Sequence, residues 1–142
     1  MKKIRTLWIA ATCALLPHGL TANATAAADD AGMDKPLICA ATEATQCQET
    51  ETCVQGPATV FNLPVFFRIN FQDKIVESIR EGGERRTSRI SKVEKNGGAI
   101  ILQGADETTA WIATIQASSG RMTVAAAREG QAFVVFGSCT RL

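Results

Sequence analysis

The chain has 142 residues, of which 46% are hydrophobic and 20% charged, and its formal net charge is +1 at pH 7. This length accommodates a single domain, and the apolar fraction is that of a folded protein rather than a disordered one. Its only histidine is His18 and it has no tyrosine, so a Ser-His-Asp or Cys-His mechanism is excluded once the segment described next is removed.

The first 28 residues have the layout of a secretory signal peptide. Three basic residues precede an uncharged run over residues 7–16, and small residues continue to Ala28. The run is shorter than the roughly 20 apolar residues of a transmembrane helix. We expect cleavage after Ala28, with Ala24 and Ala26 as alternatives, and export to the periplasm or the medium without a transmembrane segment.

The remaining chain is expected to form a flexible acidic N-terminus, residues 29–36, and one domain, residues 37–142. Residues 1–28 hold three of the 15 basic residues and none of the 14 acidic ones. The exported chain therefore carries a small negative charge. This small negative charge gives no reason to expect an acidic partner.

Four cysteines remain in the exported chain, which predicts two disulfides. Four cysteines allow three pairings. We prefer Cys39 with Cys139 and Cys47 with Cys53, because the first pair joins the earliest and latest predicted strands; the other two pairings stay open. The long gap before Cys139 disfavours a four-thiolate zinc site, and the absence of CxxC disfavours a thioredoxin-type redox pair. We therefore expect no metal and no cofactor.

Short apolar or alternating segments separated by turn residues predict strands throughout the domain. Asn96-Gly97 is the clearest hairpin turn, because both residues tolerate the positive φ of a type I′ turn. The expected strands cover residues 37–41, 64–71, 74–80, 87–95, 99–103, 109–116, 121–127 and 131–140. They indicate an all-β fold, a small antiparallel meander of about eight strands that closes into an up-and-down barrel; a β-sandwich is the alternative.

A basic stretch between residues 80 and 95 is the first candidate binding surface. Six basic residues outnumber three acidic ones there, and the candidates for binding are Arg85, Arg86, Arg89 and Lys92. No aromatic residue lies between Phe71 and Trp111 to stack on bases, so no nucleic-acid partner is expected. The alternative interpretation is a solvated strand whose charges prevent edge-to-edge pairing.

The barrel interior is the second candidate site. The residues that could line a ligand cavity are Val65, Phe67, Trp111 and Ile115. Such a cavity would hold a small apolar molecule. The alternative is a packed core, because a domain of this size has little interior to spare.

Catalytic motifs are missing. The sequence contains no GxSxG, Walker or HExxH pattern, and its carboxylates gather in loops and at the N-terminus, so we expect no enzyme. We therefore expect an exported, monomeric binding protein. It is expected to be a protein-interaction or inhibitor module, or alternatively a carrier of a small apolar ligand.

The order of motifs resembles that of small exported bacterial β-proteins of unassigned activity, with a short strand at Cys39 opening the domain and VVFGSCT at Cys139 closing it. Ser119-Gly120 and Glu129-Gly130 are also similar to the Ser-Gly recognition loop and Lys-Gly turn of membrane-bound C-type lysozyme inhibitors, which are small exported β-barrels. The tyrosine that follows Ser-Gly in that family is missing here, and Glu129 replaces the lysine. The resemblance implies that Ser119 and Gly120 form a recognition turn.

Overall fold

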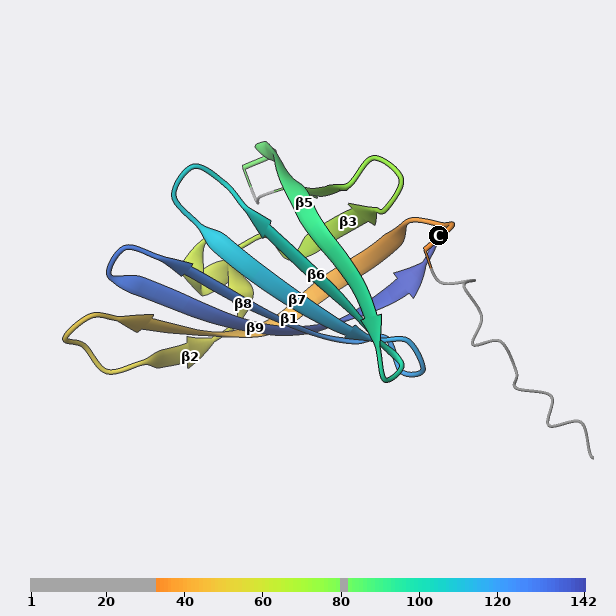
Figure 1. Cartoon of the computed structure of the whole chain (residues 1–142). Helices are drawn as coiled ribbons and strands as arrows, with labels where there is room; N and C mark the ends of the chain where they lie inside the picture. Colours follow the sequence, from red (N-terminus) through yellow and green to blue (C-terminus); the bar gives the residue numbers. More distant parts are fainter. Residues whose placement is uncertain (1–32, 80–81) are drawn as a thin grey trace, which may run out of the picture.

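The computed structural model describes residues 33–79 and 82–142, so the expected signal peptide and residues 29–32 lie outside the described residues. The described chain forms nine antiparallel strands and one short 3₁₀ turn (Figure 1). The strands are β1 (Leu37–Gln48), β2 (Val54–Gly56), β3 (Phe66–Asn70), β4 (Ile75–Ile79), β5 (Arg85–Asn96), β6 (Ala99–Ala105), β7 (Ala110–Gln116), β8 (Arg121–Arg128) and β9 (Gln131–Arg141). The 3₁₀ turn is η1 (Ala58–Phe61).

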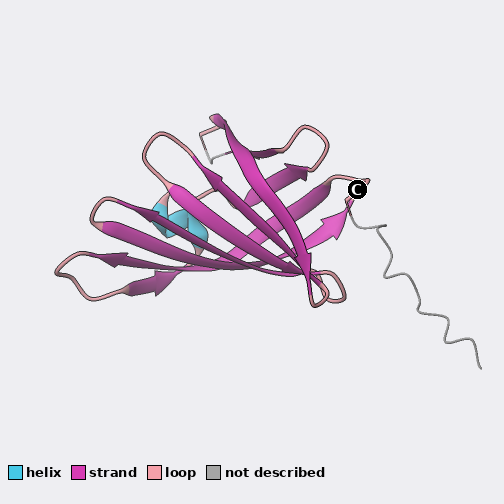
Figure 2. Cartoon of the chain, in the orientation of Figure 1, coloured by secondary structure: helices cyan, strands magenta, loops and turns pink. Residues whose placement is uncertain are grey.

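Eight of the strands close into an antiparallel barrel. Strands β3 to β9 pair in sequence order, and β1 completes the ring by pairing with β3 on one edge and β9 on the other. Strand β2 pairs with β1 as an extra strand, and η1 is the single helical element drawn in Figure 2. This confirms the predicted all-β closed meander, and the sandwich alternative is not adopted.

Strand β1 is longer than the sequence predicts. We expect strand over residues 37–41 and an acidic loop after it, but β1 continues to Gln48. It pairs with β9 along this whole length, from Leu37 opposite Arg141 to Gln48 opposite Gln131, with one irregularity between Ala41 and Glu43. The backbone hydrogen bonds to β9 hold this polar segment in strand conformation although its side chains give no apolar pattern.

The β5–β6 hairpin turns one residue later than predicted. Asn96 is the last residue of β5 and pairs with Ala99, so the two-residue turn is Gly97–Gly98 rather than Asn96–Gly97. Both glycines have positive φ, 56° and 81°, as a type I′ turn requires. The turn type is the expected one, shifted by one residue along the chain.

The core fills the barrel with apolar side chains, and none of the described polar or charged residues is fully buried. Leu102 and Cys39 are the largest side chains with essentially no exposure. The main cluster of buried residues is Leu37, Cys39, Ile69, Phe71, Ile90, Ile100, Leu102, Ala113, Ile115 and Met122. Met33, from the segment expected to be flexible, packs against this cluster.

Two disulfides cross-link the fold. Cys39 and Cys139 are direct partners in the β1–β9 register, so their disulfide (S–S 2.05 Å) joins the first and last strands of the ring. The second disulfide links Cys47 in β1 to Cys53 just before β2. This is the pairing that the sequence analysis prefers. Two disulfides indicate a protein that resides outside the reducing cytoplasm.

Candidate functional site

A cleft of about 680 Å³ lies where β3 begins, β4 ends and β5 begins. Its apolar lining comes from the start of β3 and from the segment that precedes it: Leu63, Val65, Phe66 and Phe67, with Ile38 of β1. Its polar lining includes Arg68, Glu77, Ser78, Arg85 and Arg86. A second hollow, beside Met33 and Phe71, measures about 230 Å³. It is smaller than the roughly 300 Å³ at which small-molecule sites begin.

The strand register explains how the cleft acquires its side chains. Cys39, Phe67, Ser78 and Arg86 are successive partners across β1, β3, β4 and β5. Partners in an antiparallel sheet share a face. Because Cys39 is fully buried in the barrel, the other three also lie on the inward face. The residues next to them along each strand lie on the outward face, so both faces contribute at this end of the barrel.

The wall formed by the segment before β3 is held by backbone hydrogen bonds. The amide of Ala41 in β1 donates to the carbonyl of Val65 (2.7 Å), and the amide of Leu63 donates to the carbonyl of Ala58 (3.0 Å). Ala58, the buried residue of η1, packs in a small cluster with Ala41, Ala44 and Val135. The η1 segment is therefore anchored to β1 and fixes one side of the cleft.

Among the described residues that line the cleft, three are arginines and one is a glutamate, so positive charge dominates its polar lining. Arg86 is paired with Glu84 at 3.4 Å between Nε and Oε1, and both side chains are more than half exposed. Within the part of the chain that the structure describes, the side chains of Arg68 and Arg85 form no ion pair and no hydrogen bond. Arg68 lies directly opposite Glu77 in the β3–β4 register without forming an ion pair with it.

The candidate basic surface is divided along β5. Arg85 and Arg86 line the cleft, whereas Arg89 and Lys92 lie farther along the strand, outside it. Lys92 forms an exposed ion pair with Glu94 (2.8 Å). The structure therefore assigns two of the four basic candidates to the cleft.

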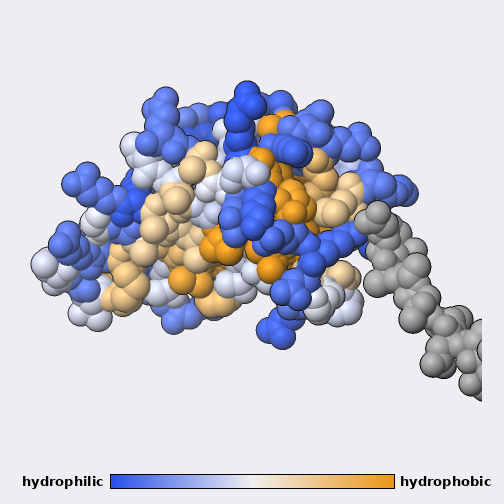
Figure 3. Space-filling view, in the orientation of Figure 1, coloured by the Kyte–Doolittle hydropathy of each residue, from blue (hydrophilic) through white to orange (hydrophobic). Residues whose placement is uncertain are grey.

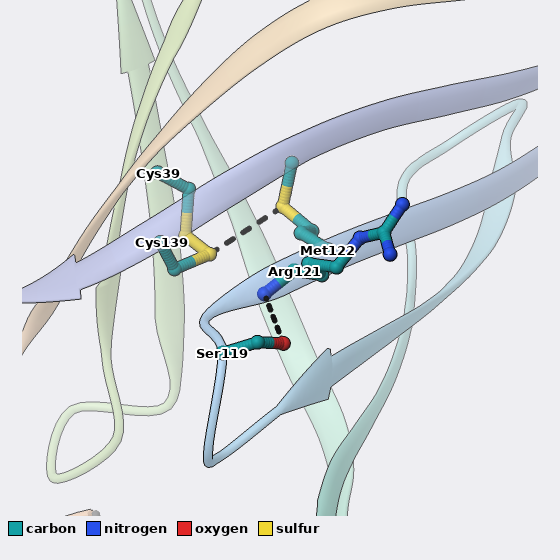
Figure 4. The surroundings of a disulfide bond; sticks show 5 residues. All are labelled: Cys39, Ser119, Arg121, Met122 and Cys139. Carbon is teal, nitrogen blue, oxygen red and sulfur yellow. Dashed lines mark hydrogen bonds between the residues drawn. A yellow bond between two sulfur atoms is a disulfide. The ribbon is translucent and has the colours of Figure 1, made fainter.

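Ser119 and Gly120 lie at the opposite end of the barrel, in the turn between β7 and β8. This turn adjoins the β5–β6 turn, since the amide of Ala117 donates to the carbonyl of Gly98 (2.9 Å). The carbonyl of Gly120 accepts a hydrogen bond from the amide of Cys139 (2.7 Å), and Ser119 Oγ accepts one from the amide of Arg121 (3.3 Å). Figure 4 shows the turn beside the Cys39–Cys139 disulfide. The backbone of the turn is thus tied to β9.

The four candidate cavity residues also separate. Val65 and Phe67 line the cleft, whereas Ile115 is buried in the main cluster. Trp111 packs against that cluster and donates from Nε1 to Ser88 Oγ (2.8 Å), and the Ser88 hydroxyl donates to Asp106 Oδ1 (2.5 Å). The structure brings two of the four candidates together at the cleft and places the other two in the packed part of the barrel.

The sequence analysis did not single out the other residues that line the cleft, among them Leu63, Phe66 and Arg68. Leu63 lies in a connecting segment, where no periodic pattern marks its direction. Phe66 and Arg68 alternate with Phe67 and Ile69, which predicts that they face outward but not that a cleft opens beside them. The one available signal was an apolar residue, Phe66, at a position that the alternation assigns to solvent.

No protein-family model, curated protein or solved structure matches the chain. Among residues 33–79 and 82–142, no cluster of three or more His, Cys, Asp or Glu residues could hold a metal ion. The described residues also include no helix with the length and apolar character to cross a membrane. We treat the cleft as the candidate binding site because its volume is larger than that of the second hollow.

Proposed function

We propose that this is an exported, non-enzymatic binding protein whose cleft holds a small ligand with a substantial apolar part. The cleft carries the proposal. Its volume of about 680 Å³ falls within the roughly 300–1,000 Å³ of small-molecule sites, which are lined mainly by apolar and aromatic side chains. The proposal develops the carrier hypothesis but moves the site from the centre of the barrel to its end.

The exposure of Phe66 supports the proposal. This side chain borders the cleft and is 60% exposed, so much of its ring remains in water. Covering apolar area is favourable by roughly 25 cal/mol per Å². A bound apolar group would therefore gain affinity by covering Phe66 while it also contacts Leu63 and Phe67.

A fluorescence titration tests this function. The mature, disulfide-bonded chain is titrated with the neutral probe N-phenyl-1-naphthylamine, in parallel with the variants Phe66→Ala and Phe136→Ala. Phe136 is a matched control, because it is also an exposed phenylalanine (43%) and does not line the cleft. We expect saturable binding that Phe66→Ala weakens by roughly fivefold or more and that Phe136→Ala leaves unchanged. Absence of saturable binding, or equal effects of the two variants, contradicts the proposal.

A second candidate function, a protein-interaction module, is favoured by the outer face of β6–β9. Neighbouring outward residues there form three rows across the four strands without a charged residue: Ala105–Ala110–Ala127–Ala132, Gln103–Ile112–Ala125–Val134 and Ile101–Thr114–Thr123–Phe136. Ile112, Val134 and Phe136 are substantially exposed, and Figure 3 shows hydrophobic surface over these strands. Contiguous apolar surface on a small protein is typical of interaction sites.

Two measurements test this second candidate. Proteins from the exporting cell's own extract are captured on the immobilised chain and on Ile112→Lys, whose fold is checked by circular dichroism. Retention of the same proteins by both contradicts an interaction through this face. The inhibitor version is tested with C-type lysozyme: an unchanged rate of cell-wall hydrolysis in the presence of excess protein contradicts it.

A further inference from the structure

The cleft combines apolar side chains at the start of β3 with arginines on β3 and β5, and the register of β3, β4 and β5 fixes their spacing. Phe66, Ile79 and Arg85 form one row of partners, and Phe67, Ser78 and Arg86 form the next. Each row begins with a phenylalanine on β3 and ends with an arginine on β5. Strands lie about 4.8 Å apart, so the backbones of each phenylalanine and arginine are separated by about 10 Å. An arginine side chain spans much of that distance.

Two of the three arginines of the cleft have no ionic partner among the described residues. Arg68 and Arg85 make no ion pair or hydrogen bond through their side chains within that part of the chain, and Glu77 is the one carboxylate among the described residues that line the cleft. A guanidinium presents a rigid fork of N–H donors that matches the two oxygens of a carboxylate or phosphate. Two such groups at the rim of an apolar cleft favour a ligand that carries negative charge.

We infer that the ligand of this cleft is a single-chain amphipathic anion, which places its apolar chain against Leu63, Phe66 and Phe67 and its anionic group near Arg68 and Arg85. The inference rests on the proposed function and adds the chemical class of the ligand. A neutral apolar molecule would leave both guanidinium groups without a partner. A small hydrophilic anion would leave the exposed ring of Phe66 uncovered. An acyl carboxylate pairs with the guanidinium groups and also covers the ring of Phe66.

The experiment uses displacement of N-phenyl-1-naphthylamine by decanoate and by decanol, which have the same chain and differ in charge. Both competitors are titrated against the unaltered chain, Arg68→Gln, Arg85→Gln and Arg89→Gln. Arg89 is the matched control, because it lies on β5 with Arg85 but outside the cleft. Both arginines are exposed at the rim, so the expected preference is moderate. Decanoate should displace the probe roughly tenfold more effectively than decanol at low salt.

Removal of either cleft charge should reduce the preference for decanoate, and removal of the control charge should not. In Arg68→Gln and Arg85→Gln we expect the advantage of decanoate to fall to roughly threefold or less, and in Arg89→Gln to stay unchanged. Added salt should lower it in the unaltered chain, since exposed charges are screened. Equal displacement by decanoate and decanol in the unaltered chain, or a preference that stays undiminished in both cleft variants, overturns the inference without contradicting the apolar cleft. Failure of the probe itself to bind overturns the proposed function as well.

A vesicle arm distinguishes a free amphipathic acid from a lipid in a bilayer. The chain is floated with phosphatidylglycerol vesicles and with phosphatidylcholine vesicles, with and without decanoate. We expect no vesicle association. Flotation with phosphatidylglycerol that Arg85→Gln abolishes, and that decanoate does not compete, would overturn the free ligand and assign the arginines to a membrane surface.

Discussion

Gly104 and Trp111 are direct partners across β6 and β7, and the indole ring of Trp111 occupies the space that a side chain at position 104 would need. A Cβ atom at Gly104 would overlap both the indole ring and the backbone carbonyl of Arg89 on the neighbouring strand. The ring therefore occupies the space beside Gly104 in the barrel wall. This arrangement lets Trp111 reach Ser88 from the main core cluster.

Gly104→Ala should destabilise the barrel strongly. The added methyl group meets backbone on β5 and a large ring on β7, and neither can move without disturbing the sheet. We expect a loss of about 2–3 kcal/mol in the free energy of unfolding, measured by urea denaturation followed through Trp111 fluorescence. Gly82→Ala is the control, because a Cβ there meets no atom within 4 Å. Equal midpoints for the two variants would contradict the close approach.

The hydrogen-bond chain from Trp111 through Ser88 to Asp106 should contribute measurable coupling. Ser88 Oγ accepts from the indole and donates to the carboxylate, so Ser88→Ala leaves the indole N–H without its partner. We expect Ser88→Ala and Trp111→Phe each to destabilise the fold. In a double-mutant cycle, we expect a coupling of about 1 kcal/mol. Additive effects in urea denaturation followed by circular dichroism would show that the bond contributes nothing.

The two disulfides should differ in their contribution to stability. Cys39–Cys139 spans a sequence separation of 100 residues and Cys47–Cys53 a separation of 6. In the chain-entropy model, the first contributes about 4–5 kcal/mol and the second about 2 kcal/mol. The measurement compares guanidinium denaturation of the two double Cys→Ala variants. A larger loss from the short loop than from the long one would contradict this order.

Alanine substitutions at Gly120 and Gly130 should distinguish the cost of backbone strain from the cost of close packing in a turn. Both have positive φ, 68° and 64°. A Cβ at Gly120 would overlap the carbonyl oxygen of Cys139, whereas at Gly130 the nearest atom is Glu49 Oε2 at 3.7 Å. Gly130→Ala should cost about 1 kcal/mol from strain alone, and Gly120→Ala about 1–2 kcal/mol more. Equal thermal midpoints would show that the Gly120 turn is not held against β9, and would reopen its role in recognition.

Local patterns in the sequence predict much of the barrel wall. The boundaries of the meander strands can be predicted to within a few residues from local signals, such as the alternation from Phe67 to Phe71 and the turn residues around Gly97 and Gly130. Such signals suffice because side-chain direction and turn geometry depend on adjacent residues. The second half of β1 was not predicted, because its polar residues are held in strand conformation by β9, roughly 80–90 residues away in the chain.

The candidate site was less predictable than the wall. The sequence identifies Val65, Phe67, Arg85 and Arg86 as candidates, but in two unrelated sets, one for a cavity and one for a surface. Only the register unites them: Phe67 and Arg86 belong to one row across three strands. Register depends on strand pairing over the whole sheet, which no local pattern specifies.

The sequence by itself determined the all-β class, the number of disulfides and the pattern of inward and outward residues, since these follow from composition and from a period of two. The tertiary structure alone decided that β1 continues along β9 as far as Gln48, that the Ser119–Gly120 turn is tied to Cys139, and that a cleft opens at the start of β3. These features depend on which distant segments meet, and that choice is made by the free energy of closing and packing the entire barrel rather than by any one segment.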